Sequence, residues 1–350
     1  ALFTEPATAL QAAIKEVKEH GFEESNPFHR LILLSHSSYE QDEIWARKFP
    51  VFDWVIGSHS QKFTRKPLLE GKTKIVQVLS QNHYLGQIGF DLSASKEKDE
   101  FMIHEIHESL SQKIENNPWE AFIQAHKTEM SRLQEIEQQN TKSMPSATAV
   151  APYKDAKSCI ECHQPQGDKW HSTAHSVAYA TLLKSNEAKN LTCVTCHSLG
   201  LGDESGFTNT LDMTQFEKDD KREQYWSEVE KSFSSVKSIR ELPPKSVTKL
   251  SKNWMALDEK FEVKRQMANV QCMNCHNQHP DHPFHIADEK PTLDQKNQAM
   301  QGKCMTCHNQ DQSPSWYLKN ENGLAGDIDQ KILDQKIKAV ACPKLESSSY

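Results

Sequence analysis

The chain lacks any long apolar run. Only 36% of its 350 residues are hydrophobic and 25% are charged, and nowhere do about 18 apolar residues follow one another as in a membrane-spanning helix. A basic excess is also missing, because 41 Lys and Arg stand against 48 Asp and Glu. We therefore expect no membrane span and no nucleic-acid partner. The sequence opens at Ala1 without a charged and apolar leader, so we expect any targeting peptide to have been removed or to lie outside this sequence.

Cysteine and histidine, in contrast, are abundant and ordered. Eight of the nine Cys fall into four copies of a Cys-x-x-Cys-His motif. The copies are Cys159, Cys162 and His163; Cys193, Cys196 and His197; Cys272, Cys275 and His276; and Cys304, Cys307 and His308. Two thiols at this spacing form thioethers to one porphyrin, and the following His is the proximal iron ligand. The motifs predict four covalently bound haem c groups.

Other chemistry could use the same thiols. Cys-x-x-Cys also occurs in dithiol redox sites and zinc ribbons, and two zinc ions could take all eight sulfurs. Neither alternative explains a His after every second Cys. Covalent attachment of haem c occurs outside the cytoplasm, so we expect a periplasmic or extracellular protein. Haem should also form the core of residues 153 to 312, and the leftover Cys342 should be an idle thiol.

Five further histidines are candidates for the distal side of the irons: His171, His175, His279, His282 and His285. The spacing of His171 and His175 predicts one helix that carries both on the same face, and His175 is the preferred ligand. Prolines between His279 and His285 favour an extended segment whose histidines point to different haems. Complete bis-His ligation, which suits electron transfer, is therefore permitted.

Residues 153 to 312 resemble the tetrahaem cytochrome c-554 family of nitrifying bacteria. The similar segments are Tyr153 and Ser158 before the first motif, 170–178 around His175, 193–200 with Gly206 and Phe207, and 272–282. The resemblance implies stacked haem pairs within van der Waals distance, mostly bis-His irons, and in some members one open iron.

The first hundred residues follow a different pattern. Helical periodicity covers 7–20, where Gly21 stops the helix, and 39–48. Short apolar runs predict strands at 31–34, 51–56, 74–79 and 86–92, with a polar loop over 57–61. We therefore expect an α/β layer with polar residues at its strand ends, where such folds keep their sites.

This layer resembles the carboxy-terminal half of the calcineurin-like metallophosphatase domain of 5'-nucleotidases and SoxB-type thiosulfohydrolases. The matching segments are 34–36, 55–61 and 84–86. The resemblance implies that His36, His59 and Gln61 are ligands of a dinuclear metal site. The family's Asp-x-His, Gly-Asp and Gly-Asn-His motifs have no counterpart here, so the site would be vestigial, with a divalent metal as a possible cofactor, and phosphoesterase activity is not expected. A polar strand-end role for His36 and His59 stays open.

The predicted organisation has four parts. A partial metallophosphatase-like α/β region covers 1–100, a bridging helix and linker 101–152, a mainly α, loop-rich tetrahaem cytochrome c domain 153–312, and a helix with a tail 313–350. Pro243 and Pro244 should separate two helices within 213–268. A half sheet leaves an open edge, which predicts self-association or coverage by a segment before Ala1.

The motifs favour electron transfer along four closely spaced haems between a donor and an acceptor redox protein. The acidic surface would steer basic partners. One alternative is an oxidoreductase that reduces a nitrogen or sulfur oxyanion at an open iron. Another is a haem-wire subunit of an extracellular assembly.

Overall fold

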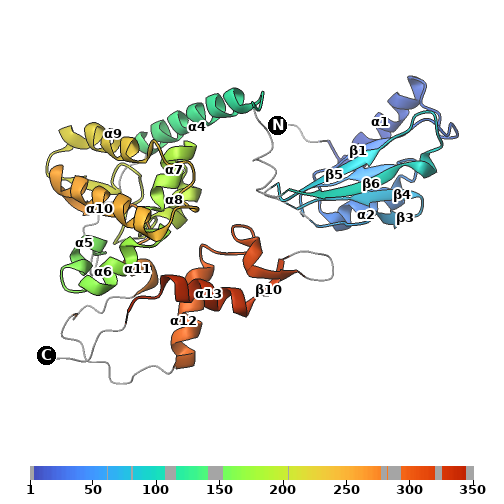
Figure 1. Cartoon of the computed structure of the whole chain (residues 1–350). Coiled ribbons are helices and arrows are strands. Elements are labelled where there is room, and N and C mark those ends of the chain that lie inside the picture. The colour runs from blue at the N-terminus through green and yellow to red at the C-terminus, as the bar shows by residue number, and fades with distance from the viewer. Residues whose placement is uncertain are drawn as a thin grey trace. The chain divides into compact units, whose positions relative to one another are not determined.

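The computed structural model describes residues 4–60, 62–79, 82–106, 116–140, 153–203, 205–276, 282, 293–319 and 325–343. The chain divides into two compact units, one of Ala1–Glu115 with Lys319–Gly326 and one of Asn116–Leu318 with Asp327–Tyr350. Figure 1 shows the elements of each unit. None of the helices in the described ranges combines the length and the apolar character that crossing a bilayer requires.

The N-terminal unit is built on a four-stranded sheet of order β1-β2-β4-β3. Its parallel strands are β1 (Ile32–Leu34), β2 (Trp54–Ile56) and β4 (Thr73–Val76), and β3 (Leu68–Glu70) joins β4 antiparallel. The helices are α1 (Pro6–Glu19) and α2 (Tyr39–Lys48), followed along the chain by the short 3-10 helix η1 (Lys96–Lys98). The predicted helices at 7–20 and 39–48 are confirmed, as are strands within 31–34, 51–56 and 74–79. Gly21 follows α1 with φ of +95°, the left-handed conformation typical of a helix stop.

A second, two-stranded sheet pairs β5 (Tyr84–Gly89) with β6 (Glu100–Glu105). The strand predicted at 86–92 corresponds to β5, which begins at Tyr84 and ends at Gly89. β6 was missed, because its residues were assigned to a linker. In β6 the side chains alternate between exposed and half-buried, as expected for a strand. The strand begins and ends with a charged residue, at 100 and 105, so a search for apolar runs does not detect it.

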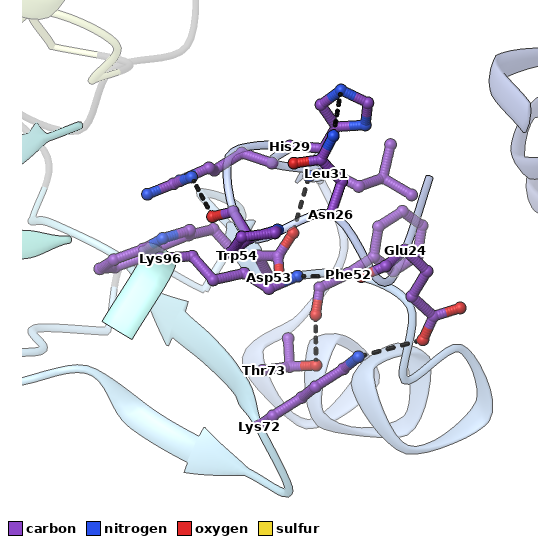
Figure 2. Close-up of polar contacts among 12 residues, drawn as sticks. Glu24, Asn26, His29, Leu31, Phe52, Asp53, Trp54, Lys72, Thr73 and Lys96 are labelled. Carbon is purple, nitrogen blue, oxygen red and sulfur yellow. Dashed lines mark hydrogen bonds and ion pairs between the residues drawn. The ribbon is translucent and has the colours of Figure 1, made fainter. Parts of the chain in front are cut away.

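Polar contacts join segments that are distant in the sequence of the N-terminal unit (Figure 2). The Asp53 carboxylate accepts the backbone N–H of Leu31 at 2.9 Å and pairs with Lys96 at 2.9 Å. The Thr73 hydroxyl donates to the Phe52 carbonyl at 2.8 Å. These bonds hold β2 against its neighbours on both sides, so the short strands do not depend on ladder hydrogen bonds alone.

Arg30 and Asp99 form the most enclosed ion pair of this unit among the described residues. Arg30 Nη2 lies 2.8 Å from Asp99 Oδ1, and the two side chains are 5% and 1% exposed. The indole N–H of Trp54 donates to the same carboxylate at 3.3 Å. Because both charges are removed from water, each depends on the other for its solvation.

We expect Arg30→Met to destabilise the N-terminal unit by about 3 kcal/mol, because the substitution leaves the Asp99 carboxylate buried without its cation. Denaturant unfolding followed by tryptophan fluorescence measures the change. Lys15→Met is the matched control, since the Lys15–Glu19 pair is 79% and 62% exposed and such pairs contribute little. Equal effects of the two substitutions would contradict this account of the buried pair.

The second unit is mainly helical, as predicted for residues after the linker. Its first helices are α4 (Glu120–Asn140), α5 (Ala156–Ile160), α6 (Gln164–His171), α7 (Tyr179–Ser185) and α8 (Leu191–His197). They are followed by α9 (Arg222–Phe233), α10 (Pro244–Lys260), α11 (Cys272–Cys275), α12 (Leu293–Met305) and α13 (Gln330–Val340). Strands β7 (Thr214–Phe216) and β8 (Val263–Gln266) pair antiparallel. Strands β9 (Tyr317–Lys319) and β10 (Ala325–Ile328) form a separate two-stranded sheet. The predicted break at Pro243 and Pro244 is confirmed, because α10 begins at Pro244.

The core of this unit differs from the expectation that haem would supply it. A side-chain core runs through α7 to α10 and the β7–β8 pair. Its largest fully buried members include Tyr225, Phe233, Met213 and Met267, and Trp254 packs edge-on against Phe233 at 5.5 Å between ring centroids. The aromatic residues of 213–268 are interspersed with charged ones, and each buries a large apolar area. The low hydrophobic content of the whole chain therefore did not predict this side-chain core.

The predicted open edge lies at β1. In the described part of the sheet β1 pairs with β2 alone, and Leu34 at its end is 76% exposed. Self-association or coverage of this edge by another segment stays a prediction.

Candidate functional site

Each Cys-x-x-Cys-His motif forms one turn of helix. The backbone N–H of the motif His donates to the carbonyl of the first Cys, from His163 to Cys159 at 3.0 Å, from His276 to Cys272 at 2.9 Å and from His308 to Cys304 at 2.9 Å. The second motif ends α8 in the same conformation. Residues spaced by three and four share a helix face. Every motif therefore presents two thiols and an imidazole on one side.

The four turns lie in two neighbouring pairs. The thiols of Cys159 and Cys272 lie near enough to affect each other's ionisation, which lowers the pKa of Cys159 and raises that of Cys272. The thiols of Cys196 and Cys307 affect each other in the same way, which lowers the pKa of Cys307 to about 6 and raises that of Cys196. The first motif thus adjoins the third, and the second adjoins the fourth.

The thiols are available for thioethers. All nine Cys lie in the described ranges, and none of them forms a disulfide. Cys342 follows α13 and lies near the third motif. When it is ionised, its negative charge raises the pKa values of Cys272 and Cys275, although burial raises them more. Cys342 is exposed, and its predicted role as an idle thiol stays a prediction.

Two proximal histidines are oriented through their Nδ1 atoms. Nδ1–H of His197 donates to the Ala178 carbonyl at 2.7 Å, and Nδ1 of His308 bonds the Ser313 hydroxyl at 2.9 Å. Such a bond fixes the ring and leaves Nε2 for a metal. Burial lowers the pKa of His197, and it lowers the pKa of His308 to about 4, so both rings are neutral at pH 7, as ligation requires.

The ring of His308 is also fixed on one face. Trp316 stacks on it with 4.2 Å between centroids and 10° between planes, and the Tyr317 hydroxyl donates to the His308 carbonyl at 2.9 Å. Sequence reasoning missed Ser313, Trp316 and Ala178. Their types and spacing carry no motif, and only the fold brings them to the imidazoles.

Two predicted distal histidines lie near motif histidines. The His175 and His308 ring centroids are 6.3 Å apart, and those of His282 and His163 are 6.0 Å apart. Burial and the nearby His197 lower the pKa of His175. His279 and His285 lie outside the described residues, so their predicted roles are not examined by the structure.

The prediction that one helix carries His171 and His175 is wrong. Helix α6 ends at His171, and His175 lies in the separate 3-10 turn η2 (Ala174–Val177). The hydroxyls of Ser172 and Thr173 bond the carbonyls of residues 169 and 170 at 2.6 and 2.8 Å, which takes the acceptors that a continuing helix would use. The two imidazoles therefore have different surroundings.

His171 turns toward α10 instead of toward a motif. Its Nδ1 bonds the Ser251 hydroxyl at 2.8 Å, and the residue is 4% exposed. Burial lowers its pKa. The bond to Ser251 holds the His171 ring between α6 and α10. Unlike His175, His171 has no motif histidine beside it in the described part of the chain, and its predicted role as a distal ligand stays a prediction.

In the N-terminal unit the structure brings His36 and His59 together at the ends of β1 and β2. Nδ1 of His59 lies 3.4 Å from Nε2 of His36, whose Nδ1 bonds the Ser58 hydroxyl at 2.7 Å. Gln61 lies outside the described residues. Over the ranges that the structure describes, no group of three or more His, Cys, Asp or Glu is arranged to hold a metal ion. The vestigial dinuclear site stays a prediction.

The sequence profile of the family described as cytochrome c554 and c-prime matches residues 158–221. Residues 158–221 are a cytochrome c-like region. This cytochrome c-like region holds the first two motifs and His175, and its family implies covalently bound haem c and a c-type cytochrome role in electron transfer. Comparison with curated proteins and with solved structures gives no match.

Proposed function

We propose that the chain is a tetrahaem c-type cytochrome that passes single electrons between redox proteins in the periplasm or at the cell exterior. The observation that carries the proposal is the repeated helical turn with two thiols and an imidazole, which recurs outside the cytochrome c-like region at Cys272 and Cys304. The third and fourth turns adjoin the first and second. Because Cys304 and Cys307 also act on Cys275, the two pairs of turns are neighbours as well.

The donor set fits haem c. Each turn supplies two thiols for thioethers and an imidazole for iron, and at His197 and His308 the bond at Nδ1 leaves Nε2 for the metal. Haem c supplies a one-electron iron couple when it is bound. The chain's part is to hold the porphyrins close together, to fix the proximal rings and to limit water around them.

The imidazole pairs identify candidate axial ligands. Two metal–nitrogen bonds of about 2 Å each, with the radii of two imidazole rings added, give centroids about 6 Å apart. The His175–His308 and His282–His163 separations of 6.3 and 6.0 Å agree with this value. We therefore propose His175 opposite His308 on one iron and His282 opposite His163 on another. Two imidazoles that held each iron in this way would leave no exchangeable position on it, which would favour electron transfer over substrate reduction.

Haem content and spin state test the proposal. Pyridine haemochrome analysis should give four haems per chain, in keeping with the four motifs. Paramagnetic resonance of the oxidised protein should show low-spin iron at the two assigned pairs. A high-spin fraction that shifts with nitrite or cyanide would instead support the alternative of an oxidoreductase with an open iron. A colourless chain that binds zinc would contradict both the electron-transfer proposal and the oxidoreductase alternative.

The Ser313 hydroxyl offers a finer test of how His308 is held. Ser313→Ala removes the Nδ1 partner, so the imidazole becomes a poorer donor to oxidised iron and the potential of that haem should rise. A tenfold loss in relative affinity for the oxidised state corresponds to about 59 mV. Spectroelectrochemical titration measures the shift. Ser315→Ala, two residues along the chain, should leave every potential unchanged, and equal shifts in both variants would contradict a specific role for Ser313.

A further inference from the structure

A half-buried carboxyl of α10 takes part in a hydrogen-bond network of the second unit. Asp258 of α10 bonds the Tyr225 hydroxyl of α9 at 2.5 Å. The Tyr225 oxygen also accepts the indole N–H of Trp254 at 2.8 Å and the amide N–H of Gln266 at 2.6 Å. These two donors occupy the lone pairs of the phenol, so its own hydrogen must point to Asp258 Oδ1. A proton on Asp258 is therefore carried by the other oxygen, Oδ2.

The surroundings of Asp258 bring its pKa close to neutral pH. Burial raises the pKa of Asp258 to about 7, and the charge of Asp155 adds to the effect, while the bonds from Tyr225 and Gln266 oppose it. The nearest cation, Lys157, is engaged with Glu259 at 3.5 Å. Burial and hydrogen bonding therefore act on the pKa of this carboxyl in opposite directions, and burial has the larger effect.

A small cavity beside Asp258 reaches Asp155 and Gln271, the residues that precede helices α5 and α11. It has a volume of about 30 Å³, and its polar lining includes Asp155, Ser176, Ser251, Asp258, Asn269 and Gln271. A cavity of this volume with several polar partners accommodates water. Asp155 caps α5 by accepting the Ser158 N–H at 3.0 Å, and Gln271 caps α11. These two helices carry Cys159 and Cys272, the thiols that contact each other.

We propose that Asp258, held by Tyr225, Trp254 and Gln266, is a proton-binding site coupled to reduction of the haem pair at the first and third motifs. The inference rests on the proposed electron-transfer function. When an external reductant adds one electron to this pair, the added negative charge favours the neutral carboxyl, and one proton from solvent binds Asp258 Oδ2. Reoxidation returns the electron to the acceptor and the proton to solvent, so charge balances in both directions.

Other charged groups near α10 are engaged elsewhere. On α6, Asp168 pairs with Lys252 at 3.0 Å and His171 bonds Ser251. On η2, His175 lies by His308. On β8, the guanidinium of Arg265 donates to the Gly206 carbonyl at 2.9 Å, and burial lowers its pKa. Asp155, with Gln266 N–H and Ser158 as its donors, is the charged group that acts most directly on Asp258.

The test is a redox titration of the full haem-loaded chain between pH 5.5 and 8.5. In the wild type, the midpoint of one haem pair should fall as the pH rises through about 7, with a limiting slope of 59 mV per tenfold change in proton concentration. Asp258→Asn keeps the shape of the side chain but cannot titrate, so the slope should be lost. Glu259→Gln removes an adjacent carboxylate that is 63% exposed and should keep the slope.

A second measurement does not depend on the variant folding. Infrared difference spectra of the wild type, reduced minus oxidised at pH 7, should gain a protonated carboxyl band that moves when aspartate is labelled with ¹³C. No band, or a band that labelling leaves in place, would overturn the proposal and assign any pH dependence to the haem propionates. A full slope in Asp258→Asn would do the same. Reducible haem bands in all these samples would leave the proposed electron-transfer function intact.

Discussion

Replacing Cys159 and Cys162 together by serine yields a chain with one covalent haem fewer than the wild type, if the four motifs are attachment sites. Serine cannot form a thioether, and the two sulfurs of one turn serve one porphyrin. Pyridine haemochrome analysis and intact mass under denaturing conditions should both show the loss. The remaining three motifs should stay loaded, because each turn has its own thiols and histidine.

The matched control for this prediction is Cys342→Ser. Cys342 lies near the third motif but follows no attachment pattern, so its haem content should equal that of the wild type. Full haem content in the double serine variant would contradict attachment at the first motif. Loss of bound zinc instead of haem would identify the thiols as a metal site.

His175→Met should raise the potential of one haem by on the order of 100 mV, a fraction of the roughly 0.8 V over which axial ligands set haem potentials. Thioether sulfur stabilises reduced iron relative to a second imidazole, and His175 lies 6.3 Å from His308 between ring centroids. Spectroelectrochemical titration with resolved midpoints measures the shift. His175→Gly should give a high-spin signal from the same iron, because glycine supplies no ligand.

His171→Asn provides the control for His175→Met. His171 faces Ser251 rather than a motif, so the haem potentials and spin states should not change, whereas unfolding should occur at lower denaturant concentration because a buried hydrogen bond is lost. A spin-state change in His171→Asn with none in the His175 variants would reverse the assignment of the two histidines.

The chemistry of the motifs could be predicted from the sequence because it is local. Two thiols and an imidazole within five residues need only one helical turn, and each motif forms it. The N-terminal helices were equally accessible, since α2 has the predicted limits and Ser38 caps it by accepting the Gln41 N–H. In these segments, residues close in the sequence determine the helical turn, so the sequence pattern is enough to predict it.

The remaining features depend on contacts that are distant in the sequence. The pairing of the first motif with the third joins residues more than a hundred positions apart, and no spacing rule gives it. His171 and His175 match a helical period, but the hydroxyls of Ser172 and Thr173 end the helix between them. The Asp258 network draws on α9, α10 and β8, so it could be recognised only once those elements were placed.

The side-chain core of the second unit has a consequence for maturation. It closes around Tyr225, Phe233 and Trp254, and Cys193 is the one motif cysteine that packs against it. We therefore expect folding of this core to depend little on the other three motifs. On this basis, we expect the loss of one haem at the first, third or fourth motif to be a local defect that leaves the side-chain core folded.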